Sequence, residues 1–333
     1  MRSVASTALA LLVLLGGCGG SREDGPPGGS PKGDTRRELM IFHAGSLSVP
    51  MSEMARTFEA AHPGVRVLLE AAGSRTCARK ISDLGRACDV MASADYLVID
   101  NLLIPEHAGW NIRFAANEMA IVYGEHSRRA EEIDSLNWHG ILLDPDVSFG
   151  RSDPDSDPCG YRAVLTMRLA ERHYGLPGLA DRMLAKDTRF IRPKETDLLA
   201  LLETGSIDYI FLYRSVAGQH GLRQVSLPPE INLGDPAFSG LYATVSVEVT
   251  GAEPGTTIVH RGAPMVYGVT IPGNAPSPDL AILFVSYLLD PAGGGAVMRR
   301  NGQPSVVPSP TDTYDRIPEP LRRYAAPPGD APR

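Results

Sequence analysis

One stretch near residue 40 constrains the fold of this chain more than any other. Residues 39–44 form an apolar run that ends at Gly45 and Ser46, and apolar residues recur at helical spacing after Pro50. The pattern predicts a buried strand, a tight turn and the start of a helix. The first N–H groups of a helix lack partners within it, so this turn can hold an anion, although one Gly-Ser pair also suits an ordinary turn.

The same pattern follows a second time. Residues 65–72 form another apolar run, which ends at Gly73 and Ser74, and Cys77 and Ile81 continue at helical spacing. The carboxyl ends of parallel strands meet at one edge, where open α/β sheets bind their ligands. The repetition predicts two helix N-termini that face one crevice, an arrangement suited to a small, desolvated anion.

A third helix start is predicted in the densest polar stretch, residues 150–162. Asp157 is suited to cap a helix and Pro158 to occupy its first position, and apolar residues between 163 and 170 share one face. The acidic residues also allow a calcium loop, but the regular EF-hand spacing and its closing Glu are absent. We therefore interpret the stretch as a further helix N-terminus.

The two ends of the chain have the composition of targeting and linking segments. Residues 1–18 resemble a bacterial lipoprotein signal peptide, in which Cys18 closes the lipobox Leu-Gly-Gly-Cys and is lipidated; an ordinary cleaved signal is the alternative. Residues 19–37 are predicted to be a flexible tether and 326–333 a disordered tail. We expect an exported protein, lipid-anchored to the cell envelope on the periplasmic side or on the outer face of the cytoplasmic membrane.

Charge and cysteine content narrow the possible partners. The formal net charge of −7 argues against a nucleic-acid partner. Besides Cys18 the chain has Cys77, Cys88 and Cys159, which permit one disulfide and one free thiol. Their spacing fits no zinc site.

Several blocks of sequence resemble the tungstate- and molybdate-binding proteins of ABC transporters, the WtpA/ModA group. The matching blocks run from about residue 39 to 310 and include residues 42–47, 73–80, 89–96, 150–162, 213–220, 227–233 and 266–272. The resemblance implies an α/β fold of the type II periplasmic-binding-protein class. Each of its two lobes has a mostly parallel sheet flanked by helices. Two crossing strands form the hinge, and residues 112–123 and 265–272 are the candidates for them. Residues 38–116 with 273–325 would form lobe 1, and 117–272 would form lobe 2.

The resemblance also implies a set of ligand-binding residues in the cleft between the lobes. The oxyanion-binding residues carried over, together with one suggested replacement, are Gly45, Ser46, Ser74, Asp157, Pro158, Cys159 and Glu230. In archaeal members two carboxylates also join the metal, and the second comes from a position occupied here by Leu212. Either Glu230 takes over that function, so that Asp157 and Glu230 are the ligands of tungsten or molybdenum, or Glu230 is a solvated loop residue.

The resemblance places Cys77 and Cys159 near each other at helix starts that line the cleft. Whether these two are bonded stays open, because Cys88 is an equally suitable partner for Cys77.

The function implied is that of a monomeric binding lipoprotein, without catalytic activity or cofactor. It captures tungstate, molybdate or both and delivers them to an ABC permease. Another oxyanion such as sulfate is an alternative, and so is an exported hydrolase with Ser46 as nucleophile and His43 as base. The Gly-x-Ser-x-Gly pattern of many hydrolases is absent. A tethered adhesion or scaffold protein, a third possibility, would not need two matched Gly-Ser turns.

Overall fold

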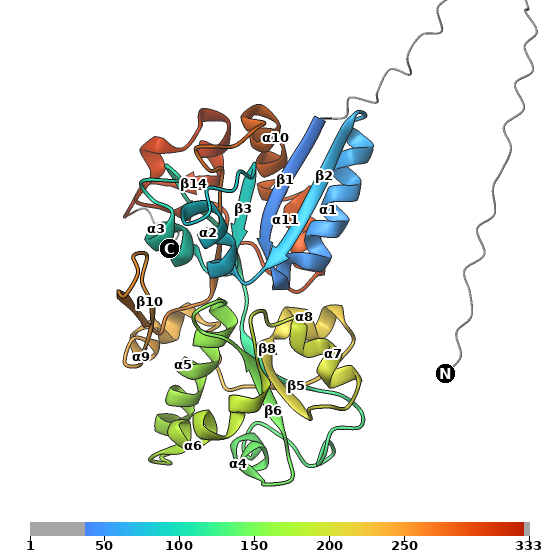
Figure 1. The fold of residues 1–333 in the computed structure, drawn as a ribbon, viewed down its shortest axis with the longest axis vertical. Helices are drawn as coiled ribbons and strands as arrows, with labels where there is room; N and C mark the ends of the chain where they lie inside the picture. Colours follow the sequence, from blue (N-terminus) through green and yellow to red (C-terminus); the bar gives the residue numbers. More distant parts are fainter. Residues whose placement is uncertain (1–36, 330–333) are drawn as a thin grey trace, which may run out of the picture. The chain divides into compact units, whose positions relative to one another are not determined.

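The computed structural model of the chain describes residues 37–329, apart from the side chain of residue 187 (Figure 1). The predicted signal peptide, Cys18 and nearly all of the predicted tether lie outside the described residues. Arg37, which we expected to end the tether, is the first residue of a strand.

The first lobe is built on a five-stranded sheet with the order β2-β1-β3-β12-β4. Strands β1, β2 and β3 are parallel, and β12 is antiparallel to its neighbours. These strands are β1 (Arg37–Ala44), β2 (Val65–Ala72), β3 (Val90–Ser93), β4 (Ile112–Ala116) and β12 (Val266–Thr270). The helices of this lobe are α1 (Ser48–Ala61), α2 (Ser74–Ser82), α3 (Tyr96–Leu102), α10 (Pro278–Leu289) and α11 (Gly294–Arg300), and the 3-10 turn Gly45–Leu47 leads into α1.

The second lobe has its own five-stranded sheet, with the order β7-β6-β8-β5-β9. Its strands are β5 (Met119–Tyr123), β6 (Phe149–Ser152), β7 (Ile191–Arg192), β8 (Tyr209–Tyr213) and β9 (Arg223–Ser226). Its helices are α4 (Trp138–Leu143), α5 (Pro158–His173), α6 (Leu179–Lys186), α7 (Asp197–Glu203) and α8 (Arg214–Gln219). Figure 1 shows these helices around the lower sheet.

Shorter elements complete the chain. The hairpin of β10 (Ser246–Thr250) and β11 (Thr257–Arg261) follows the short helix α9 (Ser239–Tyr242), and β13 (Ser309–Pro310) pairs with β14 (Ala325–Ala326). Further 3-10 turns span Asp187–Phe190, Pro236–Phe238, Tyr314–Arg316 and Glu319–Tyr324. Among the described residues no single helix is long and apolar enough to cross a membrane, although the bent pair α10 and α11 together meets that length and composition.

The structure confirms the predicted two-lobed α/β fold and both strand–Gly-Ser–helix units. The stretch from 112 to 123, expected to be one crossing strand, is two strands that separate at Asn117 and Glu118. Strand β12 lies within the range that we expected for lobe 2, yet it pairs with β3 and β4 of the first sheet. Ala326, expected at the start of the disordered tail, pairs with Pro310.

The two lobes contact each other through the turns that follow their parallel strands. The Thr76 N–H at the start of α2 donates to the Ser156 carbonyl at 3.2 Å. Deeper in the contact, Asp95 of the first lobe accepts a hydrogen bond from Tyr161 and pairs with Arg162 at 3.1 Å. Removing one partner of a buried ion pair destabilises a protein by several kcal/mol. The pair therefore fixes the orientation of one lobe against the other.

Gly73 is required by this contact rather than by its backbone conformation, since its φ of −56° and ψ of 140° suit any residue. A Cβ at this position would lie 2.3 Å from the Ser156 carbonyl oxygen and 2.9 Å from that of Pro193, both in the second lobe. We therefore expect Gly73→Ala to push the lobes apart and to increase the radius of gyration measured by small-angle scattering.

Gly140→Ala is the matched control, because a Cβ on this residue of α4 meets no atom within 4 Å. The scattering profile of that variant should superimpose on the parent profile. A Gly73→Ala profile that also superimposes would contradict the steric role of Gly73.

Candidate functional site

The candidate site lies where the turns after the parallel strands of the two lobes meet. Gly45 and Ser46 follow β1, Ser74 begins α2 after β2, and Asp157 precedes α5. The side chains of Ser46, Ser74 and Asp157 are buried. The structure thus combines the three helix starts predicted from the sequence.

Both serine hydroxyls accept a hydrogen bond within the protein and have a proton left to donate. Ser46 Oγ accepts a hydrogen bond from the Tyr267 hydroxyl at 3.0 Å, and Ser74 Oγ accepts one from the Ala94 N–H at 2.9 Å. Because a hydroxyl has one proton and two lone pairs, each serine keeps its own proton for another acceptor. Two such donors beside helix N-termini suit an anion with several oxygen atoms.

Asp157 joins two segments of the second lobe. Its Oδ1 accepts the Cys159 N–H at 3.2 Å, which caps α5, and its Oδ2 accepts the Glu195 N–H at 2.9 Å. Pro158 is the first residue of α5, as predicted. Burial raises the pKa of Asp157, although the hydrogen bonds that it accepts act in the opposite direction. Asp157 therefore caps α5 as predicted, and its carboxylate is fully desolvated.

Glu195 is a site residue that the sequence reasoning missed. It lies in the loop between β7 and α7, and a Cβ on Gly45 would lie 2.8 Å from both of its carboxylate oxygens. Burial, followed by the neighbouring charge of Asp157, raises the pKa of Glu195 well above its usual value. The pair of carboxyl groups therefore faces the first Gly-Ser turn across the contact between the lobes.

Glu230 is not brought to this cluster. It is half-buried in a turn, where its negative charge helps to raise the pKa of Tyr174 and of Tyr242. Tyr174 follows the C-terminal end of α5 and Asp157 precedes its N-terminal end, which separates them by about 24 Å for 16 residues. Leu212 is buried in β8. Among the described residues no group of three or more His, Cys, Asp or Glu side chains could hold a metal ion by itself.

The cysteines of the described chain are free thiols. Cys77 and Cys88 belong to one apolar cluster, whereas Cys159 belongs to the larger core. Burial raises the pKa of Cys77 and of Cys88 to about 12, so neither thiol is reactive near neutral pH. The Cys159 thiol contacts the Phe211 carbonyl and takes no part in a link between the lobes.

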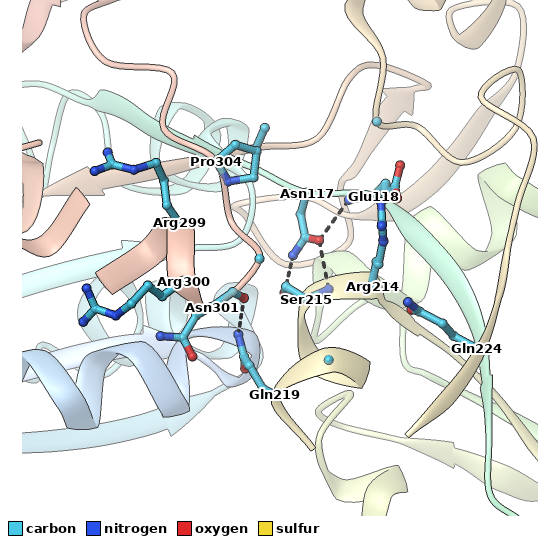
Figure 2. A pocket seen from close by; sticks show the side chains of 14 residues that line it. Asn117, Glu118, Arg214, Ser215, Gln219, Gln224, Arg299, Arg300, Asn301 and Pro304 are labelled. Carbon is cyan, nitrogen blue, oxygen red and sulfur yellow. Dashed lines mark hydrogen bonds and ion pairs between the residues drawn. The ribbon is translucent and has the colours of Figure 1, made fainter. Parts of the chain in front are cut away.

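A hydrogen-bonded chain connects the hinge to Ser46. The Asn117 side-chain amide, between β4 and β5, donates to Ser215 Oγ at 2.7 Å and to the Tyr267 hydroxyl at 2.9 Å. Figure 2 shows Asn117 and Ser215 in a cavity of about 620 Å³ at this hinge. Tyr267 then donates to Ser46, so the position of the hydroxyl donor depends on the hinge.

A second cavity, of about 650 Å³, lies beside the first Gly-Ser turn. Gly45 and Thr196 contribute to its lining, together with residues of α1 and α8. Ser46, Ser74 and Asp157 line neither of these two cavities. These three side chains are buried instead.

The geometry does not favour the hydrolase alternative. His43 Nδ1 lies 2.8 Å from the Ala44 carbonyl, to which its N–H donates, and Ser46 Oγ is bonded to Tyr267 instead of His43. Burial lowers the pKa of His43 to about 4. The serine and histidine therefore do not form the hydrogen bond that a nucleophile needs from its base.

Two lobes with a buried set of hydroxyl donors and helix N-termini between them define a solute-binding protein. A family profile described as bacterial extracellular solute-binding protein matches residues 39–302, and the chain belongs to this family. The fold agrees: the periplasmic molybdate-binding protein of Azotobacter vinelandii superimposes with a TM-score of 0.58, at 16% identity, over 80% of this chain and 98% of that one. The sulfate-binding protein SubI of Mycobacterium tuberculosis gives 0.56 at 13% identity, over 87% and 92%.

Relatives with higher sequence identity span nearly the whole chain. The molybdate/tungstate-binding protein WtpA of Pyrococcus abyssi is 39% identical, over 96% of this chain and 96% of its own length. WtpA of Thermococcus kodakarensis is 37% identical, over 95% and 94%. A protein of Petrotoga mobilis described as an uncharacterized solute-binding protein is 49% identical, over 87% and 91%.

The raised pKa of Glu195 predicts that Glu195→Gln changes the free energy of unfolding by an amount that depends on pH. A carboxyl group whose pKa is raised by folding stabilises the fold most below its unfolded pKa, and this contribution is lost as pH rises through the folded pKa. Glutamine does not ionise, so the variant does not lose this stability as pH rises. At pH 8 without ligand, its free energy of unfolding should therefore exceed that of the parent. The difference should shrink towards pH 4, by at most about 1.4 kcal/mol per pH unit.

Urea denaturation at pH 4, 6 and 8 measures this difference. Glu203→Gln makes the same chemical change at an exposed position of α7 and should leave stability nearly unchanged at every pH. A Glu195→Gln protein that is no more stable than the parent at pH 8 would show that the buried Glu195 carboxylate does not destabilise the fold.

Proposed function

We propose that this chain is the substrate-binding protein of an ABC importer and that it captures tungstate or molybdate between its lobes. The observation that carries the proposal is the pair of hydroxyls of Ser46 and Ser74, each with its lone pair engaged and its proton available. They lie with the N-termini of three helices in a buried cluster, which suits a small oxyanion with oxygens on several sides.

The presence of Asp157 in the cluster argues for the oxyanion of a metal. A buried carboxylate repels a dianion such as sulfate at short range. Tungsten and molybdenum can expand their coordination and accept a carboxylate oxygen, whereas sulfur and phosphorus in their oxyanions do not readily do so. The same side chain therefore attracts one class of oxyanion and repels the other.

The relatives support this assignment, since the WtpA proteins of Pyrococcus abyssi and Thermococcus kodakarensis are named for molybdate and tungstate. We further propose that Cys18 is lipidated after export, that the protein acts as a monomer at the cell envelope and that it delivers its cargo to a membrane permease. The lipobox sequence and the family description support export.

Thermal unfolding with added oxyanions tests the proposed function. A ligand that binds only the native protein stabilises it by RT ln(1 + [L]/Kd), about 2.7 kcal/mol at a hundredfold excess over Kd. Micromolar tungstate or molybdate should raise the melting temperature, and sulfate at the same concentration should not. An equal shift with sulfate would identify a general oxyanion-binding protein, and no shift with any of the three would contradict the proposal.

Ser46→Ala should reduce the tungstate-induced shift. The change removes a hydroxyl donor to a charged ligand, a loss of about 1.5–3 kcal/mol of binding free energy. Ser52→Ala, in the helix α1 that follows the turn, is the control, because the Ser52 hydroxyl donates to the Ser48 carbonyl, outside the cluster. Equal shifts in the two variants would exclude Ser46 from the site.

A further inference from the structure

We propose that the β10–β11 hairpin is a strap that holds the two lobes together and slows the release of a bound oxyanion. The part of this inference that concerns release rests on the function proposed above. The hairpin belongs to the segment that returns from the second lobe to the first, between β9 and β12. Figure 1 shows it at the level where the two lobes meet. Its hydrogen bonds to both lobes carry the inference.

The second lobe binds the hairpin at three places. At the tip, the Thr250 N–H and hydroxyl donate to Asp155 Oδ1 at 2.6 and 2.7 Å. At the base, Arg168 of α5 donates to the carbonyl of the first residue of β10. On β11, the His260 ring stacks on Tyr161 of α5, with ring centroids 4.5 Å apart and an angle of 12° between the planes. The hairpin is therefore bound to the second lobe along its length.

The first lobe binds the same tip through α2. Arg75 Nη2 donates to the Thr250 carbonyl, and Arg79, one turn further along α2, donates to the Gly251 carbonyl at 2.5 Å. Arg75 Nε also donates to the Asp155 carbonyl at 3.0 Å. Thr250 thus contacts the first lobe through its carbonyl and the second lobe through its N–H and hydroxyl. A rotation that separates α2 from Asp155 must break one of these two sets of hydrogen bonds.

The strap is attached next to the oxyanion cluster. Arg75 directly follows Ser74, whose hydroxyl has a proton left for a ligand, and Asp155 lies two residues before Asp157. The hydrogen bonds of Thr250 therefore hold the start of α2 against the loop that leads into α5. A ligand enclosed between these turns leaves only when they separate, so its release requires the strap to open.

Two buried nitrogen atoms make the contact of the strap reversible. Arg75 Nη1 and His260 Nε2 have no hydrogen-bonding partner among the described residues. An unsatisfied buried polar group costs free energy, and water restores its hydrogen bonds when the lobes separate. The strap therefore stabilises the contact between the lobes only modestly, as a contact that forms and breaks during binding and release must do.

The rate at which tungstate leaves the protein tests the inference, measured by stopped-flow tryptophan fluorescence. Asp155→Ala removes the acceptor of both Thr250 donors, so release should be roughly ten times faster than from the parent. Arg79→Ala weakens the attachment to the first lobe and should also speed release. Asp146→Ala is the matched control in the exposed turn before β6, at the opposite end of that strand from Asp155, and should keep the parent rate.

The double variant distinguishes a strap from two independent losses of stability. Because Asp155 and Arg79 act on the same hairpin, loss of one attachment should leave less for the second substitution to change. The double variant should therefore release tungstate more slowly than the product of the two single effects predicts. Single effects that multiply, or single variants that both keep the parent rate, would overturn the strap.

Small-angle scattering without ligand keeps the two proposals apart. Asp155→Ala should have a larger radius of gyration than the parent, because fewer hydrogen bonds hold its lobes together, and Asp146→Ala should not. A parent that binds neither tungstate nor molybdate would overturn the proposed function, and this measurement would then decide on the strap alone. An Asp155→Ala profile that superimposes on the parent profile would overturn the strap.

Discussion

The site depends on the carboxylate of Asp157. One of its oxygens caps α5 and the other holds the loop that contains Glu195, so a single buried side chain fixes two of the segments that face the first lobe. Desolvation makes this carboxylate unfavourable by itself, as its raised pKa shows. The fold tolerates the cost because the same group orders the helix N-terminus and the carboxyl pair at once.

The contact between the lobes and the two Gly-Ser turns have residues in common. The Ala94 N–H donates to Ser74 Oγ, while the Ala94 carbonyl accepts a hydrogen bond from Arg162, which also pairs with Asp95. At the other turn, Tyr267 relays hydrogen bonds between Asn117 in the hinge and Ser46. A rotation of one lobe against the other would therefore move both hydroxyl donors, and this would couple closure of the lobes to the binding that we propose.

The sequence predicted those parts of the site that come from regular patterns. Both Gly-Ser turns follow apolar runs long enough to be recognised as strands, and Asp157 followed by Pro158 is a strong helix-start signal. Glu195 was missed because β7 has only two residues, too few to show any periodicity. The pairing of β7 with Arg151 and Ser152 of β6 brings the loops after these two strands to one edge of the sheet.

The resemblance left open whether Glu230 binds the ligand or is a solvated loop residue. The structure places Glu230 near Tyr174, at the end of α5 opposite to Asp157. Tyr267 was missed for another reason. Its strand was expected to cross between the lobes, whereas β12 is fully paired in the first sheet, and this pairing fixes the tyrosine beside Ser46.

The most direct test of the central claim is the location of the bound metal. Anomalous diffraction at the tungsten edge from crystals grown with tungstate should give one strong peak between Ser46, Ser74 and Asp157, within bonding distance of the Asp157 carboxylate. A peak in the hinge cavity or on the surface, or no peak with the protein saturated, would contradict the account.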